Sequence, residues 1–411
     1  MREPSFMIVI PKKQDDIHDP GVFLSNLEKS EFITLVDTNM DERRGLIIDL
    51  CVEDRAYQLC TYPTMLQIPN YVRTVHSFTK KESEAIDAAE SGLAVTMDFA
   101  GDTALCFHDQ LRIINAMFPE ILAVLDCPSE KLLSGRWVAM AAESETLPSP
   151  RYLFTVQAVS DESGEVWLHS HGLKRAGMYE LEILGSDEDT YNTHYQIIET
   201  FAYRLLENGG STFPGDPVYI GQAAGHYLVG TAVDWKEALQ YYPNIKVGSE
   251  EDRDDGVHDE DTCVIMMYRN TDDAEKRNYT QVQAFNPLLK QNPVFLLSNQ
   301  ETERMKSLAI ERFSFAEKGF KNKDNVVIVK IGVITDKEHW NGDTPQREHM
   351  WFDLKEVRED GIVATLTNEP YYVSGLKKGD TALYPYEDIT DWIIYTPEGR
   401  ITPDDVYLYH E

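Results

Sequence analysis

The sequence predicts a multidomain α+β protein in which mixed and antiparallel sheets carry helices packed on one side. Its 411 residues are enough for about two to four domains. Strand-like runs and helix-like periodicities alternate along the N-terminal third. The C-terminal part instead holds short strands separated by turn residues, which predicts a small, strongly bent β-rich domain there.

The N-terminal third is expected to begin with a strand that Pro11 ends, followed by a helix after Asp19 and Pro20. Thr79 and Glu82 have the spacing of a capping box, which predicts a helix that ends at Gly92. Apolar residues recur at helical spacing from 105 to 118, which predicts a third helix that Pro119 ends. The predicted strands are 6–10, 32–36, 46–52, 56–62, 93–99 and 121–125, and the predicted helices begin at 20, 80 and 105.

The next region contains strands at 152–159, 166–171 and 179–184 and a helix that begins at 189 or 190. We place a domain boundary at the pair Gly209–Gly210 that ends this helix. Strands at 227–233 and 263–268 flank an acidic loop, 249–261. This loop has eight acids, is expected to be solvated, and lacks the spacing of a calcium-binding loop. The predicted domains are therefore 1–208, 209–295 and 296–411.

Charge and cysteine content exclude several classes of function. The chain has 70 acidic and 38 basic residues and a formal charge of −32, which repels nucleic-acid phosphates and anionic lipids. Its five cysteines form no C-x-x-C pair. No apolar run is long enough to span a membrane, and the first residues do not have the pattern of a signal peptide. We expect a cytoplasmic protein with reduced thiols that binds neither nucleic acid nor membranes; its oligomeric state is unknown.

The strongest candidate site is the hairpin formed by 166–171 and 179–184. Because side chains alternate along a strand, His169 and His171 share one face, and Glu180 and Glu182 share one face of the partner strand. If the apolar residues pack inward, two imidazoles and two carboxylates project from one surface. This pattern fits an exposed His/Glu ladder, acid–base chemistry or a divalent metal site. Apart from this possible divalent metal, no cofactor is expected.

The C-terminal part is locally less acidic than the rest of the chain. Residues 301–350 contain nine acidic and nine basic residues, which fits either a helix face against the acidic body of the protein or a docking patch for an acidic partner. Aromatic and polar residues on its strands are expected mainly to pack, with Asp391 capping a turn and Trp392 filling the core. The candidate binding residues here are Arg312, Lys318, Lys321, Lys323, His349, Trp351, Asp391 and Trp392.

Two resemblances follow from motifs. The C-terminal part resembles the bacterial domain-of-unknown-function family 2314 (YegJ-like) through four ordered motifs: E-H-M-W (348–351), N-x-P (368–370), L-K-x-G-D (376–380) and I-x-D-W (389–392). The preceding part, through 167–173 and 180–183, is similar to the uncharacterised family 4026, whose members can carry such a C-terminal domain. The resemblances imply a bacterial cytoplasmic protein and this domain order, and they supply no reaction.

Two functions remain open. Nucleophile elbows and phosphate-binding loops are absent from the sequence, and its acidity and aromatic content favour a non-catalytic interaction protein, regulatory or inhibitor- and immunity-like, with a basic protein partner. The alternative is a metal-binding protein or a metal-assisted hydrolase. In that case the two imidazoles of the hairpin would bind the metal, one glutamate would complete the shell and the other would handle a water proton.

Overall fold

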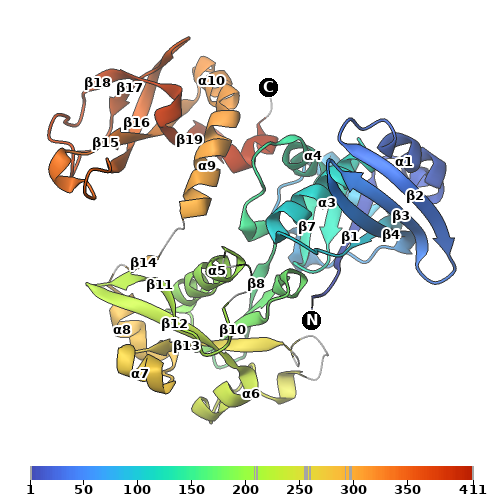
Figure 1. The fold of residues 1–411 in the computed structure, drawn as a ribbon, viewed down its shortest axis with the longest axis horizontal. Helices are drawn as coiled ribbons and strands as arrows, with labels where there is room; N and C mark the ends of the chain where they lie inside the picture. The colour runs from blue at the N-terminus through green and yellow to red at the C-terminus, as the bar shows by residue number, and fades with distance from the viewer. Residues whose placement is uncertain are drawn as a thin grey trace. The chain divides into compact units, whose positions relative to one another are not determined.

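The computed structural model describes residues 2–207, 209, 212–253, 258, 261–291, 293–295 and 299–409. It confirms an α+β protein built on three sheets (Figure 1). The chain forms two compact units: unit 1 comprises Met1–Glu143 and Pro148–Ser298, and unit 2 comprises Ser144–Leu147 and Asn299–Glu411. None of the helices in the described part of the chain is both long and apolar enough to cross a membrane.

The first sheet of unit 1 has seven strands, all paired antiparallel. Every strand predicted here is present; the strand at Lys131–Ser134 and the helix at Gly135–Glu143 were not predicted. In spatial order the strands are β2 (Ile33–Asp41), β3 (Gly45–Val52), β4 (Arg55–Met65), β5 (Ser91–Met97), β1 (Ser5–Pro11), β6 (Ile121–Asp126) and β7 (Lys131–Ser134). The helices are α1 (Pro20–Leu27), α2 (Lys80–Asp87), α3 (Thr103–Met117) and α4 (Gly135–Glu143).

The capping box at the start of α2 is confirmed, but the helix ends earlier than predicted. Both hydrogen bonds between Thr79 and Glu82 are formed. Gly92 belongs to β5 rather than to the end of the helix, since a Cβ atom there would lie 2.8 Å from the carbonyl oxygen of Val9 in β1. The glycine is therefore explained by the close approach of two strands.

The second sheet of unit 1 also has seven strands, one of whose pairings, β10 with β13, is parallel. The chain leaves α5 (Tyr191–Glu207) and re-enters this same sheet at β11, so the boundary predicted at 209 does not separate two sheets. In spatial order the strands are β14 (Val294–Phe295), β11 (Val218–Ala223), β12 (His226–Asp234), β13 (Thr262–Tyr268), β10 (Glu180–Ser186), β9 (Val166–His171) and β8 (Thr155–Ser160).

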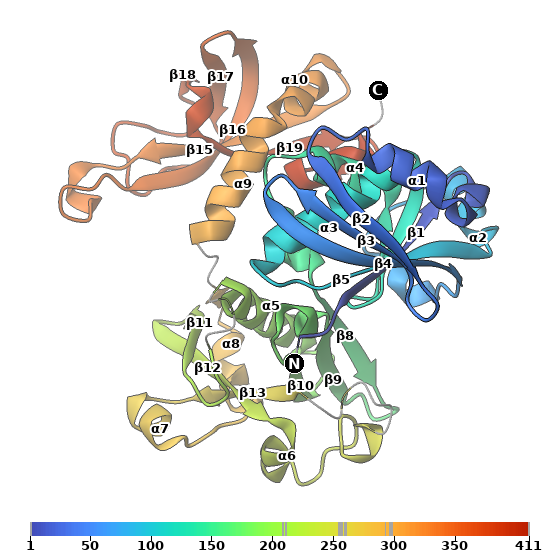
Figure 2. The ribbon, with the colours of Figure 1, turned by 45° about the vertical axis from the view of Figure 1, so that its right-hand side comes forward.

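Helices cover both faces of this second sheet. The long helix α5 lies on one face, and α6 (Trp235–Ala238) and α7 (Thr271–Lys276) lie on the other; α8 (Asn286–Leu289) follows further along the chain (Figures 1 and 2). On the α6 face, Trp167, Trp235 and Val264 belong to one buried apolar cluster. Strands β9 and β10 are therefore buried on both sides, which decides the environment of the candidate site.

Unit 2 is the small β-rich domain that the sequence predicts. Its antiparallel sheet has the order β18 (Thr381–Tyr384), β17 (Gly361–Leu366), β16 (Arg347–Arg358), β15 (Val326–Ile334), β19 (Ile389–Thr396) and β20 (Gly399–Ile401). Helices α9 (Asn299–Glu311) and α10 (Phe313–Lys321) pack against it. Trp392 is fully buried and its indole N–H donates to the carbonyl of Ala309 at 2.9 Å, so its predicted place in the core is confirmed.

Candidate metal centre

The predicted hairpin is present, but its polar face is not exposed. Strands β9 and β10 pair antiparallel, with His169 opposite Glu182 and Leu168 opposite Ile183, so imidazoles and apolar side chains do alternate between the faces. All six residues of β9 are nevertheless buried, with His169 only 2% and His171 8% exposed. The expected solvent-facing ladder is thus wrong, because α5 packs against one face of the strand and the segment that bears Arg253 and His258 covers the imidazoles on the other.

Glu180 stabilises the turn of the hairpin. The chain turns at Gly172 and Gly177, both with positive φ, on either side of a short 3-10 helix. The Glu180 carboxylate accepts hydrogen bonds from the Ser170 hydroxyl at 2.6 Å and from the backbone N–H groups of Gly172 at 2.9 Å and Lys174 at 3.2 Å. Burial raises the pKa of Glu180, and these hydrogen bonds oppose the shift.

Glu182 is bound by an arginine from the acidic loop. Its two oxygens accept from the guanidinium of Arg253 at 2.8 Å and 2.6 Å, and both side chains are buried. Burial raises the pKa of Glu182, and the Arg253 charge opposes the shift. Arg253 also donates to the carbonyls of His258 and Gly248. The predicted four-residue set is therefore not one group of ligands, since each carboxylate has another role.

A third imidazole joins the two predicted histidines. The ring centroids of His169, His171 and His258 lie 4.7 to 5.1 Å apart, and one ligand nitrogen from each lies within 4.8 Å of the others. All three are buried, and the Trp167 ring lies 4.4 Å from His169 and 5.0 Å from His258. His258 was missed because it was assigned to a solvated loop, although it is the one histidine in that loop.

The three nitrogens suit a first-row divalent metal. In a tetrahedral zinc site with Zn–N bonds of about 2.0 to 2.1 Å, ligand nitrogens are about 3.3 Å apart. The observed limit of 4.8 Å therefore requires each nitrogen to move by about 1 Å or less, which ring rotation can supply. Three imidazoles without a carboxylate or thiolate leave a fourth position for water or another ligand.

The predicted cations of unit 2 do not form one patch. Arg312 is buried and donates to the carbonyl of Pro403 at 2.8 Å. Lys321 pairs with Glu317, and Lys318 lies over the ring of Phe315. Lys323 is exposed at the end of α10.

Three of the other candidates of unit 2, His349, Trp351 and Asp391, share one face of its sheet. Lys330 lies opposite both Trp351 and Asp391, and its ammonium group is 5.5 Å from the Trp351 ring. His349 Nδ1 is 3.1 Å from the Thr390 hydroxyl. Asp391 lies within β19 and accepts from the N–H of Trp392 at 2.8 Å, so it does not cap a turn as predicted. None of these residues belongs to a group of three or more potential metal ligands among the described residues.

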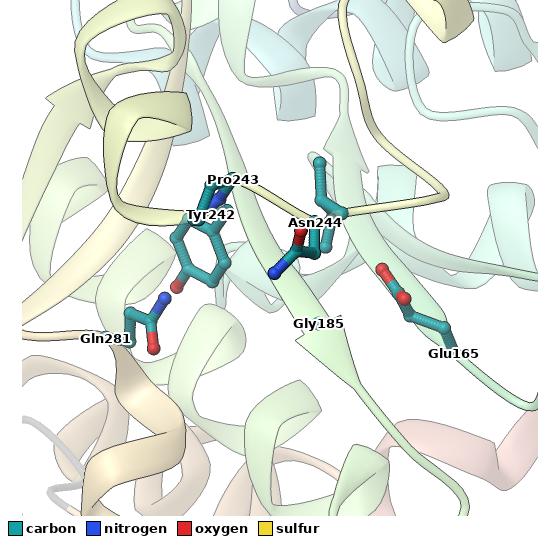
Figure 3. Close-up of a pocket in the computed structure, with 7 residues that line it drawn as sticks. Glu165, Gly185, Tyr242, Pro243, Asn244 and Gln281 are labelled. Atoms are coloured by element: carbon teal, nitrogen blue, oxygen red, sulfur yellow. The ribbon is translucent and has the colours of Figure 1, made fainter.

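A small pocket of about 250 Å³ lies elsewhere in unit 1, and Figure 3 shows its lining. Tyr242 also belongs to the apolar cluster that contains Trp167. Glu165 accepts from the backbone N–H of Lys246, and Gln281 donates to the carbonyl of Tyr241. None of its lining residues belongs to the imidazole cluster, so the three histidines do not open into this pocket.

Fold and site together define an α+β protein of two compact units with a buried imidazole cluster in unit 1. Family models match "Protein of unknown function (DUF4026) N-terminal" at residues 5–148, its C-terminal counterpart at 156–266, and "Uncharacterized protein conserved in bacteria (DUF2314)" at 307–401. The chain thus belongs to the DUF4026 family and carries a C-terminal DUF2314 domain, as the motifs predict. No curated protein and no solved structure matches it. The three histidines all lie in the second match.

Proposed function

We propose that this protein binds one divalent transition-metal ion, with zinc as the best fit, through His169, His171 and His258. The observation that carries the proposal is the convergence of three buried imidazoles, two from one strand and one from a distant segment, with ligand nitrogens within 4.8 Å of each other. Imidazole nitrogen is a preferred ligand of zinc, copper and nickel ions, whereas calcium and magnesium prefer oxygen.

The surroundings support this assignment. Arg253 donates to the carbonyl of His258, so the ion pair with Glu182 holds the backbone that bears the third imidazole. The ion pair is neutral as a whole, and neutral imidazoles add no charge. A bound ion would therefore keep its charge of +2 and attract an anionic fourth ligand such as hydroxide.

The test is metal uptake by the full chain. We expect the chelator-treated protein to take up one equivalent of Zn²⁺ by calorimetry and elemental analysis, and Co²⁺ to give the intense visible bands of a tetrahedral site. Replacing His169, His171 or His258 with Ala should weaken uptake at least tenfold. His18→Ala removes an exposed histidine of unit 1 and is the matched control. Failure to bind Zn²⁺ or Co²⁺, or equal uptake by the His258→Ala variant, would contradict the proposal.

We also propose, from the composition of the chain, that it binds a basic protein partner. Its support is the formal charge of −32, which would steer a basic protein partner toward the chain. A partner that binds through this field should associate more slowly as salt rises, with a smaller change in dissociation. Binding that is insensitive to salt would contradict it. Metal-assisted hydrolysis at this site is a further proposal, and metal-free protein by elemental analysis would contradict it.

A further inference from the structure

A larger pocket in unit 1, of about 540 Å³, lies on the second sheet beside α7. Tyr227 and Val229 of β12 and Tyr268 of β13 line it, and Val229 and Tyr268 are directly paired across the two strands. Phe285 and Leu288, from the segment around α8, also line it. None of its lining residues belongs to the imidazole cluster or to the pocket of Figure 3.

The walls of this pocket are largely apolar, with polar side chains from His226, Asn270 and Thr271, and they are partly open to solvent. Tyr227 is 74% exposed, although its ring packs edge-on against Tyr219 with the centroids 5.5 Å apart. Val229, Phe285 and Leu288 are half-buried. A volume of this size falls within the range of about 300 to 1,000 Å³ that is typical of small-molecule sites, and apolar or aromatic walls are the usual lining of such sites.

One cation lies among these walls without an acidic partner. Arg269 directly follows β13, lines the pocket and is exposed. It makes no ion pair within the described residues, in a chain where acids outnumber basic residues by 70 to 38. The two acids next along the chain have other partners: Asp272 pairs with Lys276 at 2.7 Å, and the Asp273 carboxylate accepts from the side-chain amides of Asn270 and Asn278.

We propose that this pocket binds a small aromatic anion. Its ring would lie among Tyr227, Phe285 and Leu288, and its carboxylate would accept hydrogen bonds from Arg269. A planar guanidinium binds a carboxylate in a bidentate manner, and the aromatic side chains contribute stacking and apolar burial. Because the protein as a whole repels anions, binding depends on this local cation and on the apolar contact together.

The experiment uses the full chain and the fluorescent aromatic anion anilinonaphthalene sulfonate. We expect saturable binding at one site, and displacement by naphthoate at a concentration at least tenfold lower than by its uncharged analogue naphthalenemethanol. A hydrogen bond to a charged group supports a ratio of this size. Chelator treatment should leave the titration unchanged, which separates this site from the metal centre.

Two variants separate the contribution of the Arg269 charge to binding from that of the apolar contact with Tyr227. Arg269→Gln should abolish the preference for naphthoate over the alcohol while the alcohol still binds; Tyr227→Ala should weaken both competitors at least fivefold. Both side chains are exposed, so the variants should retain the wild-type thermal unfolding midpoint. Arg43→Gln removes an exposed cation of the first sheet and is the control. Absence of saturable binding in the wild type, a preference for naphthoate that survives Arg269→Gln, or an equal loss in Arg43→Gln would overturn the proposal.

Discussion

Arg253 and Glu182 form a bidentate ion pair in the interior of unit 1, with nitrogen–oxygen distances of 2.8 Å and 2.6 Å. The Arg253 guanidinium also lies 4.4 Å from the centre of the Trp235 ring and 5.5 Å from that of Trp167. Through its bond to the carbonyl of His258, it joins β10 to the segment that bears the third imidazole. The stability of unit 1 and the geometry of the metal centre therefore depend on the same pair.

Breaking this pair should cost more than replacing it. Arg253→Met leaves a buried carboxylate without its cation, and we expect the free energy of unfolding to fall by about 3 to 5 kcal/mol, as measured by urea titration. The double variant Arg253→Met/Glu182→Met should recover much of this loss. Arg358→Met, which removes a comparable but half-exposed pair with Glu356, is the control and should change little. Additive losses in the double variant would contradict the predicted coupling.

Acid should release the proposed metal. Imidazoles bind a metal only in the neutral form, so protonation competes with the ion. At pH 7 and a metal concentration about 100 times the Kd, binding stabilises the folded chain by about 2.7 kcal/mol. We expect the resulting rise in the thermal midpoint to disappear near pH 5 and to be absent at both pH values in the His258→Ala variant. A rise that is equal at the two pH values would contradict a site made of imidazoles.

Gly248 controls the packing of the tryptophan beside the imidazoles. Its φ is +78°, and a Cβ atom there would lie 2.6 Å from Leu184 Cδ2 and 2.9 Å from Trp167 Cγ. Gly248→Ala should lower the free energy of unfolding by about 1 to 3 kcal/mol through strain and overpacking and shift the tryptophan emission. Gly164→Ala, at φ +82° with no atom near the new Cβ, measures the backbone strain alone. Equal losses in the two variants would show that the contact with Trp167 is unimportant.

The sequence predicts the hairpin well because alternation is a local property. The pairing of His169 with Glu182 follows from the side-chain period of two and the length of the turn. The burial of that face and the arrival of His258 depend on where distant segments fold back, and residue spacing does not encode this. For the same reason Arg253 was assigned to a solvated loop: eight neighbouring acids outweigh one cation in a composition argument, yet that cation is buried.

In unit 2, too, the sequence predicts the strands better than the environment of single residues. The turn residues and short apolar runs predict its strands, and the apolar character of Trp392 predicts its burial in the core. Asp391 was assigned to a turn because aspartate is common there, yet the register puts it opposite Lys330 in the middle of two strands. The pairing of β19 with β15 therefore decides the position of Asp391 in spite of its local preference for turns, and it brings the carboxyl group into a largely buried position.

The burial of Asp391 predicts a measurable pH dependence of stability in unit 2. Burial raises the pKa of this carboxyl to about 6, and the nearby Lys330 charge opposes the shift. Between about pH 4 and pH 6 the folded state keeps a proton that the unfolded state releases, so stability falls as the pH rises, by up to about 3 kcal/mol. Asp391→Asn stays neutral and should remove this loss. Hydrogen exchange of peptides from β19 in the full chain, corrected for its intrinsic pH dependence, measures the effect. Asp353→Asn, at a half-exposed position paired with Lys355, should keep the wild-type slope, and a wild-type slope in Asp391→Asn would refute the prediction.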